Sequence, residues 1–309
     1  MKSKIYVIGS SNTDMVVKSN FLPKPGETVI GDTFLMNPGG KGANQAVSAC
    51  KLGADVTFIT KVGNDMFGKK AVNNFKKIGI KTDFIRIDKN NSSGVAIIMV
   101  DKSGENSISV APGANNSLKI KDVNFIEEKL NADDYVLLQL EIPKTVVEYL
   151  IEICNKLKVK LILNPAPFQK ISDYHLSQVN TITPNEIEAE YLSGIKVKDK
   201  ETAKKASEIL INKGIKNIII TMGEKGAFYK SSSFEGLIPT KKVNVLDTTA
   251  AGDTFNGALV AGLSMKMDIL TSIEFANNAA TYSVTKLGAQ SSAPSINNLN
   301  NKFLKYVHS

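Results

Sequence analysis

The stretch DYVLLQLEIPKTVVEYLIEICNKLKVKLILNPAP, residues 134–167, decides the fold class of this chain. Two apolar runs rich in leucine, valine and isoleucine, 134–141 and 159–167, flank a segment, 143–157, whose apolar residues recur with helical spacing. Continuous apolar runs that alternate with helical segments are typical of parallel strands joined by crossover helices. The stretch therefore predicts a strand–helix–strand unit whose strands are buried on both faces.

The same alternation runs through most of the chain. Further strands are expected at 4–9, 55–63, 181–185 and 217–223, and further helices at 42–53, 67–79, 201–214, 252–265 and 269–287. This order predicts an α/β fold, a doubly wound, mostly parallel sheet with helices on both faces. No internal repeat or low-complexity linker divides the sequence, so we expect residues 1–309 to form a single domain.

Two segments, 12–38 and 92–111, interrupt this alternation. Each contains extended runs separated by turns with glycine and aspartate, and neither contains a crossover helix. We expect them to pair as a small antiparallel β lid that stands off the core, and an exposed apolar face of that lid would form a dimer contact. The same pattern also fits edge strands of the main sheet.

The composition is that of an ordinary globular protein, with 42% hydrophobic and 22% charged residues. No run approaches the ~18 apolar residues of a membrane span. The apolar run at residues 5–9 is shorter than the ~7 residues of a signal-peptide core. We therefore expect a cytoplasmic protein without a membrane partner.

The charged and nucleophilic residues exclude several classes of function. The net charge is +8, but Arg86 is the only arginine and the lysines are interspersed with acidic residues, which argues against a nucleic-acid partner. The histidines, His175 and His308, do not support a Ser-His-Asp triad or a histidine metal site. Cys50 and Cys154 lie far apart and are expected to be free thiols. Acid–base chemistry must therefore depend mainly on carboxylates.

The strongest chemical signal is DTTAAGDTFNGALVAGL, residues 247–263. Ala250, Ala251 and Gly252 are small, and their main-chain N–H groups would converge at a helix start to form an anion hole for a transferring phosphoryl group. Asp253, in the first turn of that helix, would accept a proton from a hydroxyl. The alternative is that Asp253 only caps the helix, although Asp247, Thr248 and Thr249 are better placed for that role.

A second signal is NPGGKGANQAV, residues 37–47, in which glycines surround Lys41 before a helix. Glycine allows the main chain to approach a ligand closely, and a helix N-terminus favours an anion or a polar oxygen. The stretch lacks the Walker A pattern. Asn44 beside Lys41 suggests recognition of sugar hydroxyls, and the alternative is an ordinary glycine turn.

Two weaker signals follow strand ends. In ITPNEIEAEYLSG, residues 182–194, Asn185, Glu186 and Glu188 suit Mg²⁺ held beside phosphate, or simply a well-capped helix start. In IITMGEKGAF, residues 219–228, Thr221 and the glycines that follow it permit a turn that lies against a nucleotide, although such turns are common.

GGKGANQA, LNPAP, ITPNEIEAE and DTTAAGDTFNGAL, taken together, resemble the phosphofructokinase-B (PfkB) type family of sugar and nucleoside kinases. The resemblance covers nearly the whole chain, because GSSNTD (9–14), VGNDMFG (62–68), QLEIP (139–143) and TKLGAQSSAP (285–294) fall in the family's order. Within this family, the motif GGKGANQAV distinguishes the chain from adenosine kinases and fructose-phosphate kinases.

The resemblance implies an enzyme, a phosphotransferase with an alcohol acceptor. It would transfer the γ-phosphoryl of ATP to O5 of D-ribose and release D-ribose 5-phosphate and ADP. A kinase for deoxyribose or another furanose or nucleoside is the close alternative. A non-catalytic sugar or nucleotide sensor is the alternative of another class, and the presence of Asp253 argues against it.

The resemblance also implies roles for individual residues. Asp253 would be the base, and Ala250, Ala251 and Gly252 the anion hole. The sugar hydroxyls would be held by Asn12, Asp14, Gly40, Lys41, Asn44, Glu141 and Asp253. ATP would contact Asn185, Thr221, Gly223, Gly226, Gly252 and Asn277. An activating K⁺ would be held by Asp247, Thr249, Ser283, Lys286, Gly288 and Ser292, several of them through main-chain oxygens. Glu188 would act indirectly on Mg²⁺. Segments 12–38 and 92–111 match the family's lid, which also forms the contact of a homodimer.

Overall fold

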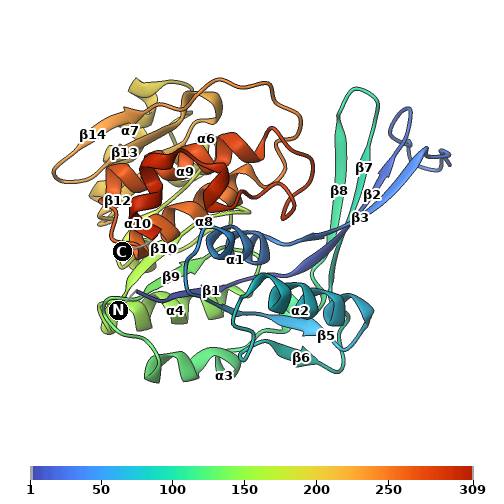
Figure 1. The fold of residues 1–309 in the computed structure, drawn as a ribbon, viewed down its shortest axis with the longest axis horizontal. Coiled ribbons are helices and arrows are strands. Elements are labelled where there is room, and N and C mark those ends of the chain that lie inside the picture. Colours follow the sequence, from blue (N-terminus) through green and yellow to red (C-terminus); the bar gives the residue numbers. More distant parts are fainter. Residues whose placement is uncertain (1–2, 308–309) are drawn as a thin grey trace.

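The computed structural model describes residues 3–307, so His308 lies outside the described residues. Its main body is an eight-stranded sheet in the order β14-β13-β12-β11-β10-β9-β1-β4 (Figure 1). These strands are β1 (Ile5–Ile8), β4 (Val56–Ile59), β9 (Tyr135–Leu138), β10 (Lys160–Leu163), β11 (Thr181–Ile182), β12 (Asn217–Thr221), β13 (Ala227–Lys230) and β14 (Glu235–Ile238). The strands from β4 to β12 are parallel, and β13 and β14 are antiparallel. The predicted α/β fold with a mostly parallel sheet is confirmed.

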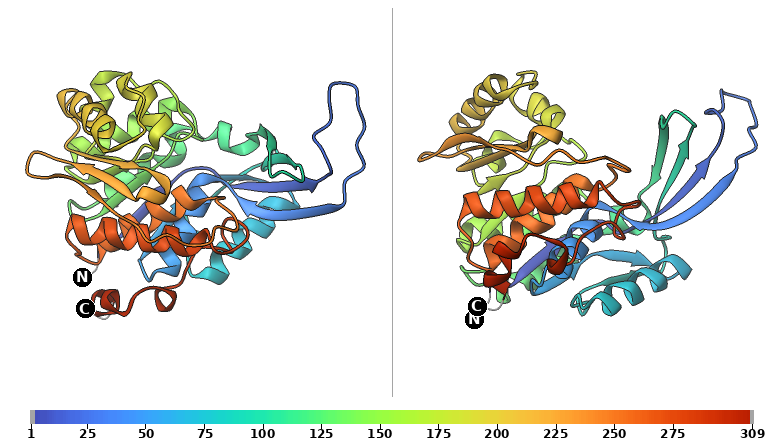
Figure 2. Two further views of the ribbon diagram at one scale, coloured as in Figure 1. Left: turned by 90° about the horizontal axis from the view of Figure 1, so that it is seen from above. Right: turned by 45° about the horizontal axis from the view of Figure 1, so that its top comes forward.

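Helices cover both faces of this sheet (Figures 1 and 2). One face packs against α4 (Lys144–Lys156), α6 (Glu186–Ser193) and α7 (Lys200–Asn212), and the other against α1 (Lys41–Lys51), α8 (Ala251–Ser264) and α9 (Ile269–Ser283). Successive strand residues point to opposite faces. In β1, Tyr6 and Ile8 pack in the hydrophobic core on the α4 face, and Ile5 and Val7 pack in the core on the α1 face. This two-sided burial explains why the strands read as continuous apolar runs.

A second, four-stranded sheet, here called the outer sheet, projects from the main body (Figure 2). Its order is β3 (Thr33–Gly39), β2 (Asn12–Lys18), β7 (Gly94–Val100) and β8 (Asn106–Ala111). The pairs β2–β3 and β7–β8 are antiparallel, and β2 and β7 join them through a parallel pairing. Segments 12–38 and 92–111 therefore form a separate small sheet, and neither is an edge of the main sheet.

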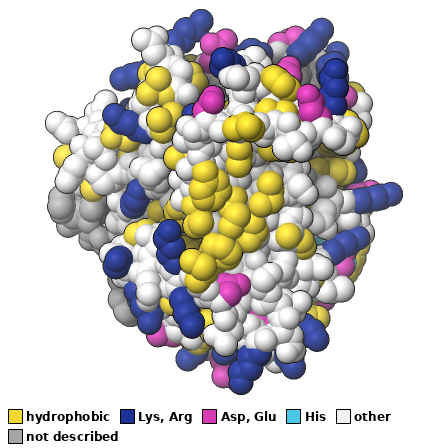
Figure 3. Space-filling view, turned by 90° about the vertical axis from the view of Figure 1, so that its right-hand side faces the viewer, with side chains coloured by type: hydrophobic (Ala, Val, Ile, Leu, Met, Phe, Trp, Pro, Cys, Tyr) yellow, Lys and Arg dark blue, Asp and Glu magenta, His cyan; other side chains and the backbone are white. Residues whose placement is uncertain are grey.

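Both faces of the outer sheet carry apolar side chains, among them the exposed residues Phe34 and Ile97 on the side opposite Asp14. The strand register places Leu35, Val16, Ile98 and Ile108 in one row across its strands, on the same side as Asp14. In β8 the exposed residue Ile108 on this side alternates with serines on the other side. Figure 3, viewed from the side on which the outer sheet projects, shows a continuous group of hydrophobic side chains with lysines beside it.

Several expected elements are shorter than predicted, and the contacts of two of them show why. The strand expected at 55–63 divides after β4, and β5 (Lys61–Gly63) pairs instead with β6 (Arg86–Asp88) in a separate two-stranded sheet. The helix α2 (Met66–Ile78) follows, and its N-cap Asp65 also accepts hydrogen bonds from Ser93 at the foot of β7. The helix expected at 269–287 ends at Ser283, because the carbonyl of Val284 accepts the N–H groups of residues 246 and 247.

The remaining elements are short. They are α3 (Ile120–Val123), α5 (Asp173–Leu176) and α10 (Leu304–Val307), together with single 3₁₀ turns. No helix within residues 3–307 has the length and apolar character needed to cross a membrane.

Candidate active site

The candidate site begins at the N-terminus of α8. Ala250, just before the helix, has left-handed backbone angles (φ 57°, ψ 19°), and the N–H of Ala251 closes the turn on the carbonyl of Thr248 (3.2 Å). A Cβ added at Gly252 would meet no atom within 4 Å. Residues 250–253 line a polar cavity of about 210 Å³. The small residues therefore leave the main chain of this turn open to that cavity.

The carboxylate of Asp253 is held from both sides. It is 7% exposed, its Oδ2 accepts from Nδ2 of Asn44 (2.9 Å), and its Oδ1 accepts from Nε2 of Gln45 (3.0 Å). Burial raises the pKa of this carboxyl, while Lys41 and the two amides act in the opposite direction. The net direction is upward, as a general base that operates near neutral pH requires.

The glycine–lysine turn packs tightly against the start of β2. Gly40 has φ 88°, and a Cβ there would lie 2.7 Å from the main-chain N of Asn12, so only glycine fits. The N–H of Lys41 donates to Oε2 of Glu141 (3.0 Å), which also accepts from the hydroxyl of Ser10 (2.5 Å). This contact joins the starts of α1 and β2 to the end of β9.

The charged groups around Lys41 influence one another. Burial alone would lower the pKa of the Lys41 ammonium, but Asp253, Glu141, Glu188 and Asp14 raise it above its usual value. Burial, together with Glu141 and Asp253, raises the pKa of Asp14 to about 6. One ammonium thus lies among several carboxylates that stand close enough to perturb each other.

Asn12 and Asn44, both predicted to bind sugar, already have partners within the protein. Oδ1 of Asn12 accepts from Asn115 (2.7 Å), and Asn44 donates to Asp253 while its Oδ1 accepts from Gln290 (3.3 Å). The structure therefore places Asn44 directly beside the candidate base.

Asn185 and Glu188 form a reciprocal cap at the start of α6. The N–H of Glu188 donates to Oδ1 of Asn185 (2.8 Å), and the N–H of Asn185 donates to Oε2 of Glu188 (2.9 Å). Both residues also line the polar cavity, so the capping and ligand-binding interpretations apply to the same pair. Burial raises the pKa of Glu188, against the opposing effects of the Asn185 N–H and Lys41. Glu186 pairs instead with Lys225 (3.8 Å).

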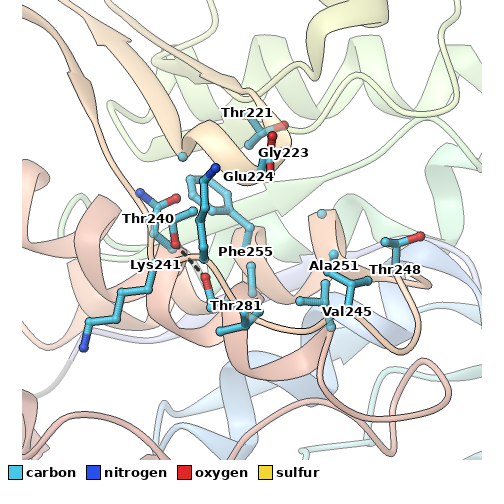
Figure 4. Close-up of a pocket in the computed structure, with 17 residues that line it drawn as sticks. Thr221, Gly223, Glu224, Thr240, Lys241, Val245, Thr248, Ala251, Phe255 and Thr281 are labelled. Atoms are coloured by element: carbon cyan, nitrogen blue, oxygen red, sulfur yellow. Dashed lines mark hydrogen bonds between the residues drawn. The ribbon is translucent and has the colours of Figure 1, made fainter.

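A second cavity, of about 360 Å³, adjoins the polar one (Figure 4). The two share Thr221, Thr248, Ala251 and Gly252. Of the residues predicted to bind ATP, the second cavity contains Thr221, Gly223, Gly226, Gly252 and Asn277. Nδ2 of Asn277 donates to the carbonyl of Ile238 (2.9 Å) and fixes the β14 end of the wall. Figure 4 also shows the hydroxyls of Thr240 and Thr281 joined by a hydrogen bond (2.6 Å).

The residues predicted to hold K⁺ lie where the segment before α8 meets the segment after α9. The Asp247 carboxylate accepts from the N–H of Thr249 and from that of Gly288, each at 2.8 Å. The carbonyl of Ser283 accepts the N–H of Lys286 (3.0 Å), and the hydroxyl of Ser292 donates to the carbonyl of Ala289 (2.7 Å). Within residues 3–307, no three His, Cys, Asp or Glu side chains are grouped to hold a metal ion. A cation here would depend largely on main-chain oxygens.

Several polar residues of the site were not predicted from the sequence. Gln45, Gln139 and Gln290 are buried and connect to Asp253 directly or through another amide. Asn164 accepts from Gln45 (3.0 Å) and lines the polar cavity. The available signal was adjacency, because Gln45 follows Asn44 in GANQA and Gln290 lies in TKLGAQSSAP.

The chain is similar to sugar kinases over almost its whole length. It is 45% identical to the ribokinase of Haemophilus influenzae, over 95% of this chain and 96% of that relative. It is 38% identical to a deoxyribokinase of Salmonella typhi, over 96% and 97% of the two chains.

Solved structures of ribokinases are also similar to this chain over almost its whole length. The ribokinase of Thermotoga maritima matches with a TM-score of 0.87 and 38% identity, over 98% of this chain and 99% of that one. The ribokinase of Arabidopsis thaliana complexed with ribose and ATP matches with a TM-score of 0.89 and 28% identity, over the full length of both chains. A model of the pfkB family of carbohydrate kinases matches residues 2–296. The chain therefore belongs to the pfkB family of carbohydrate kinases.

Proposed function

We propose that this kinase transfers the γ-phosphoryl of ATP to O5 of D-ribose, giving D-ribose 5-phosphate and ADP. The observation that carries the proposal is the position of Asp253. Its buried carboxylate borders the polar cavity, which adjoins the larger cavity, and it lies close enough to Asp14, Lys41 and Glu141 for their charges to interact. The full-length similarity to ribokinases supports ribose as the acceptor.

In this mechanism Asp253 accepts the proton of the sugar O5 hydroxyl as O5 forms a bond to the γ-phosphorus. The bond from that phosphorus to the bridging oxygen breaks, and its electron pair leaves with ADP. The main chain of residues 250–252 and the Lys41 ammonium would stabilise the phosphoryl charge. The only arginine, Arg86, contacts Phe125, so no arginine is assigned to this role.

Two cations complete the proposal. Mg²⁺ bound with the nucleotide would neutralise phosphate charge, and Glu188 beside Asn185 would orient it through water, in keeping with the oxygen ligands that this ion prefers. K⁺ would lie near Asp247 and take main-chain oxygens of the segment 283–292. The Asp247 carboxylate accepts the N–H groups of Thr249 and Gly288, and these two hydrogen bonds hold the segment before α8 against the segment after α9.

The test is ADP release measured with a panel of pentoses and nucleosides, with and without Mg²⁺ and K⁺. We expect ribose to have the highest kcat/KM, activity to require Mg²⁺, and K⁺ to stimulate it. Higher kcat/KM with another sugar would contradict the ribose assignment alone. Full activity without K⁺ would contradict only the cation site.

Deoxyribose is the second candidate acceptor, because a deoxyribokinase is 38% identical over nearly the whole chain. Ribose and 2-deoxyribose differ by one hydroxyl, and a site built to hydrogen-bond a hydroxyl discriminates strongly against a sugar that lacks it. The ratio of kcat/KM for the two sugars decides between the candidates.

We further propose that residues 1–309 act as one kinase domain in which segments 12–38 and 92–111 form the lid and the contact of a homodimer. The exposed residues Leu35 and Ile108, in the apolar row on the Asp14 side of the outer sheet, support this contact, because exposed apolar patches are typical of interfaces. Replacing Ile108 with lysine should convert a dimer to a monomer in analytical ultracentrifugation. Ser107→Lys, on the opposite face of the same strand, is the matched control. A wild-type monomer would contradict the proposal.

We also propose a cytoplasmic location, where ATP is available to a sugar kinase. Cell fractionation with an antibody to the protein tests it, and recovery in a membrane or secreted fraction would contradict it.

A further inference from the structure

The two oxygens of the Asp253 carboxylate are each reached by a chain of amide side chains. In the shorter chain, Nε2 of Gln139 donates to Oε1 of Gln45 (2.6 Å), and Nε2 of Gln45 donates to Oδ1 of Asp253 (3.0 Å). Gln45 and Gln139 are completely buried. A Cβ at Gly9 would collide with Oε1 of Gln139, so glycine at that position makes room for the first amide of the chain.

The longer chain approaches from α2. Nδ2 of Asn74 donates to Oε1 of Gln290 (3.2 Å), and Nε2 of Gln290 donates to Oδ1 of Asn44 (3.3 Å). Nδ2 of Asn44 then donates to Oδ2 of Asp253 (2.9 Å). Gln290 is 4% exposed and Asn44 is 8% exposed, so most of this chain is shielded from water.

The order of donors and acceptors gives each chain a direction. A carboxamide has an acceptor oxygen at one end and a donor nitrogen at the other. When a neighbour donates to the oxygen of Gln45 or Asn44, the nitrogen of that amide points toward Asp253. At Gln45 the Oδ1 of Asn164, which accepts from the same Nε2 (3.0 Å), favours the same orientation. The reverse orientation would place an amide oxygen against a carboxylate. Hydrogen bonds in such a series also polarise one another in a buried environment.

We propose that Gln139 and Gln290 are positioning residues that orient Gln45 and Asn44 and thereby aim one N–H at each oxygen of Asp253. Neither glutamine lines the two cavities of the active site. They act through other amides and are not catalytic residues. The proposal rests on the proposed kinase function, in which Asp253 is the base.

The charged groups that face Asp253 are not members of the two amide chains, although Lys41 shares α1 with Asn44 and Gln45, and Glu141 follows Gln139 by two residues. They are Lys41 at the start of α1, Glu141 after β9, Glu188 in α6 and Asp14 in β2. Replacing Gln139 or Gln290 leaves all of them in place. A change in the pH dependence of these variants would therefore come from the amides.

The decisive variants are Gln139→Met and Gln290→Met, which keep side-chain length and remove the donors. Loss of the aimed N–H should raise the pKa of the Asp253 carboxyl, because the amide donors act to lower it. We expect the pH at which kcat for ribose reaches half its maximum to move upward in both variants, so that their deficit in kcat is largest on the acidic side of the profile and shrinks toward high pH, where the base is ionised in every variant. Gln178→Met, at a glutamine that contacts Asn155 and Tyr174, is the matched control and should keep the wild-type profile.

Gln290→Glu guards against a Met variant that does not fold, because it keeps the size of the side chain and its acceptor for Asn74. It should shift the pH profile in the same direction. The ¹³C carboxyl signal that disappears in Asp253→Asn gives the pKa of the base without an activity measurement. Unchanged pH profiles, or a loss of kcat that is the same at every pH, would overturn the proposal. A wild-type protein without sugar kinase activity would instead overturn the proposed function.

Discussion

The stretch 247–253 contains two aspartates, Asp247 and Asp253, that accept similar hydrogen bonds but have pKa values shifted in opposite directions. Each carboxylate accepts two N–H bonds of 2.8–3.0 Å, from main-chain groups at Asp247 and from amide side chains at Asp253. Although burial raises the pKa of Asp247, its hydrogen bonds, those of Thr249 foremost, bring it below the usual value. Burial dominates at Asp253 and raises its pKa. The depth of the carboxylate, more than its number of hydrogen bonds, accounts for the opposite pKa shifts of the two aspartates.

The largest expected effect comes from Asp253→Asn. The variant keeps the shape of the side chain and removes the proton acceptor, so kcat for ribose should fall by about 10³-fold. Isothermal titration should show that ribose still binds. A kcat within tenfold of the wild type would contradict the assignment of Asp253, and not Asp247, as the base.

Gly252→Val tests whether the turn between the two aspartates is open to a ligand. A Cβ at this position meets no protein atom within 4 Å, so a branched side chain would project into space that the nucleotide phosphates need. We expect KM for ATP to rise about tenfold, with the unfolding temperature nearly unchanged, since valine is no worse a helix former than glycine. Gly252→Ala is the graded control. An unchanged KM would show that the phosphates bind elsewhere.

Asp247→Ala should act on stability and on the response to K⁺. Loss of the acceptor for the Thr249 and Gly288 N–H groups should cost about 1–2 kcal/mol of unfolding free energy at pH 7. The pKa of Asp247 is lowered in the folded state, so its contribution is present above the unfolded pKa and is lost as pH falls through the folded one. Urea denaturation should therefore show the difference from wild type shrinking below about pH 4. Stimulation by K⁺ that survives the substitution would contradict a cation role.

The smallest effect is expected at Asp14, whose pKa is raised to about 6. Because the folded pKa lies above the unfolded value, the stabilising contribution of this group is present at low pH and is lost as pH rises through about 6. The ~3 kcal/mol that this difference in pKa implies is discounted for solvent screening, because Asp14 is only partly buried. Asp14→Asn should therefore be more stable than wild type at pH 8, by about 1 kcal/mol, with the difference vanishing near pH 4. Equal stability at both pH values would mean that the carboxylates do not interact as described.

The fold could be predicted from the sequence because it depends on local patterns. Apolar runs, helical spacing and glycine are visible in any short window, and they located the strands of the main sheet and the turn at 250–253. The division at Thr60 and the two-residue length of β11 could not be read in this way, since strand pairing decides where a strand ends.

The contacts of the amide side chains around Asp253 could not be predicted from the sequence. Asn44 was predicted to face sugar, and in the structure it donates to Asp253. Gln139 and Gln290 lie in QLEIP and TKLGAQSSAP, but nothing in those stretches shows that they connect to Asp253. Their role arises only when α1, α2, β9 and the segment after α9 meet. The roles predicted for the catalytic, ligand-binding and metal-binding residues, those near α8 included, remain predictions.

The bond between Asn44 and Gln290 spans 246 residues, which has a consequence for synthesis of the chain. A ribosome-bound chain acquires Gly40, Lys41 and Asn44 early, Asp253 late and Gln290 later still. Contacts between such distant segments form slowly and after local structure. A nascent chain therefore carries Asn44 and Asp253 before Gln290 is available, and the second amide chain cannot form while only residues 1–289 have been synthesised.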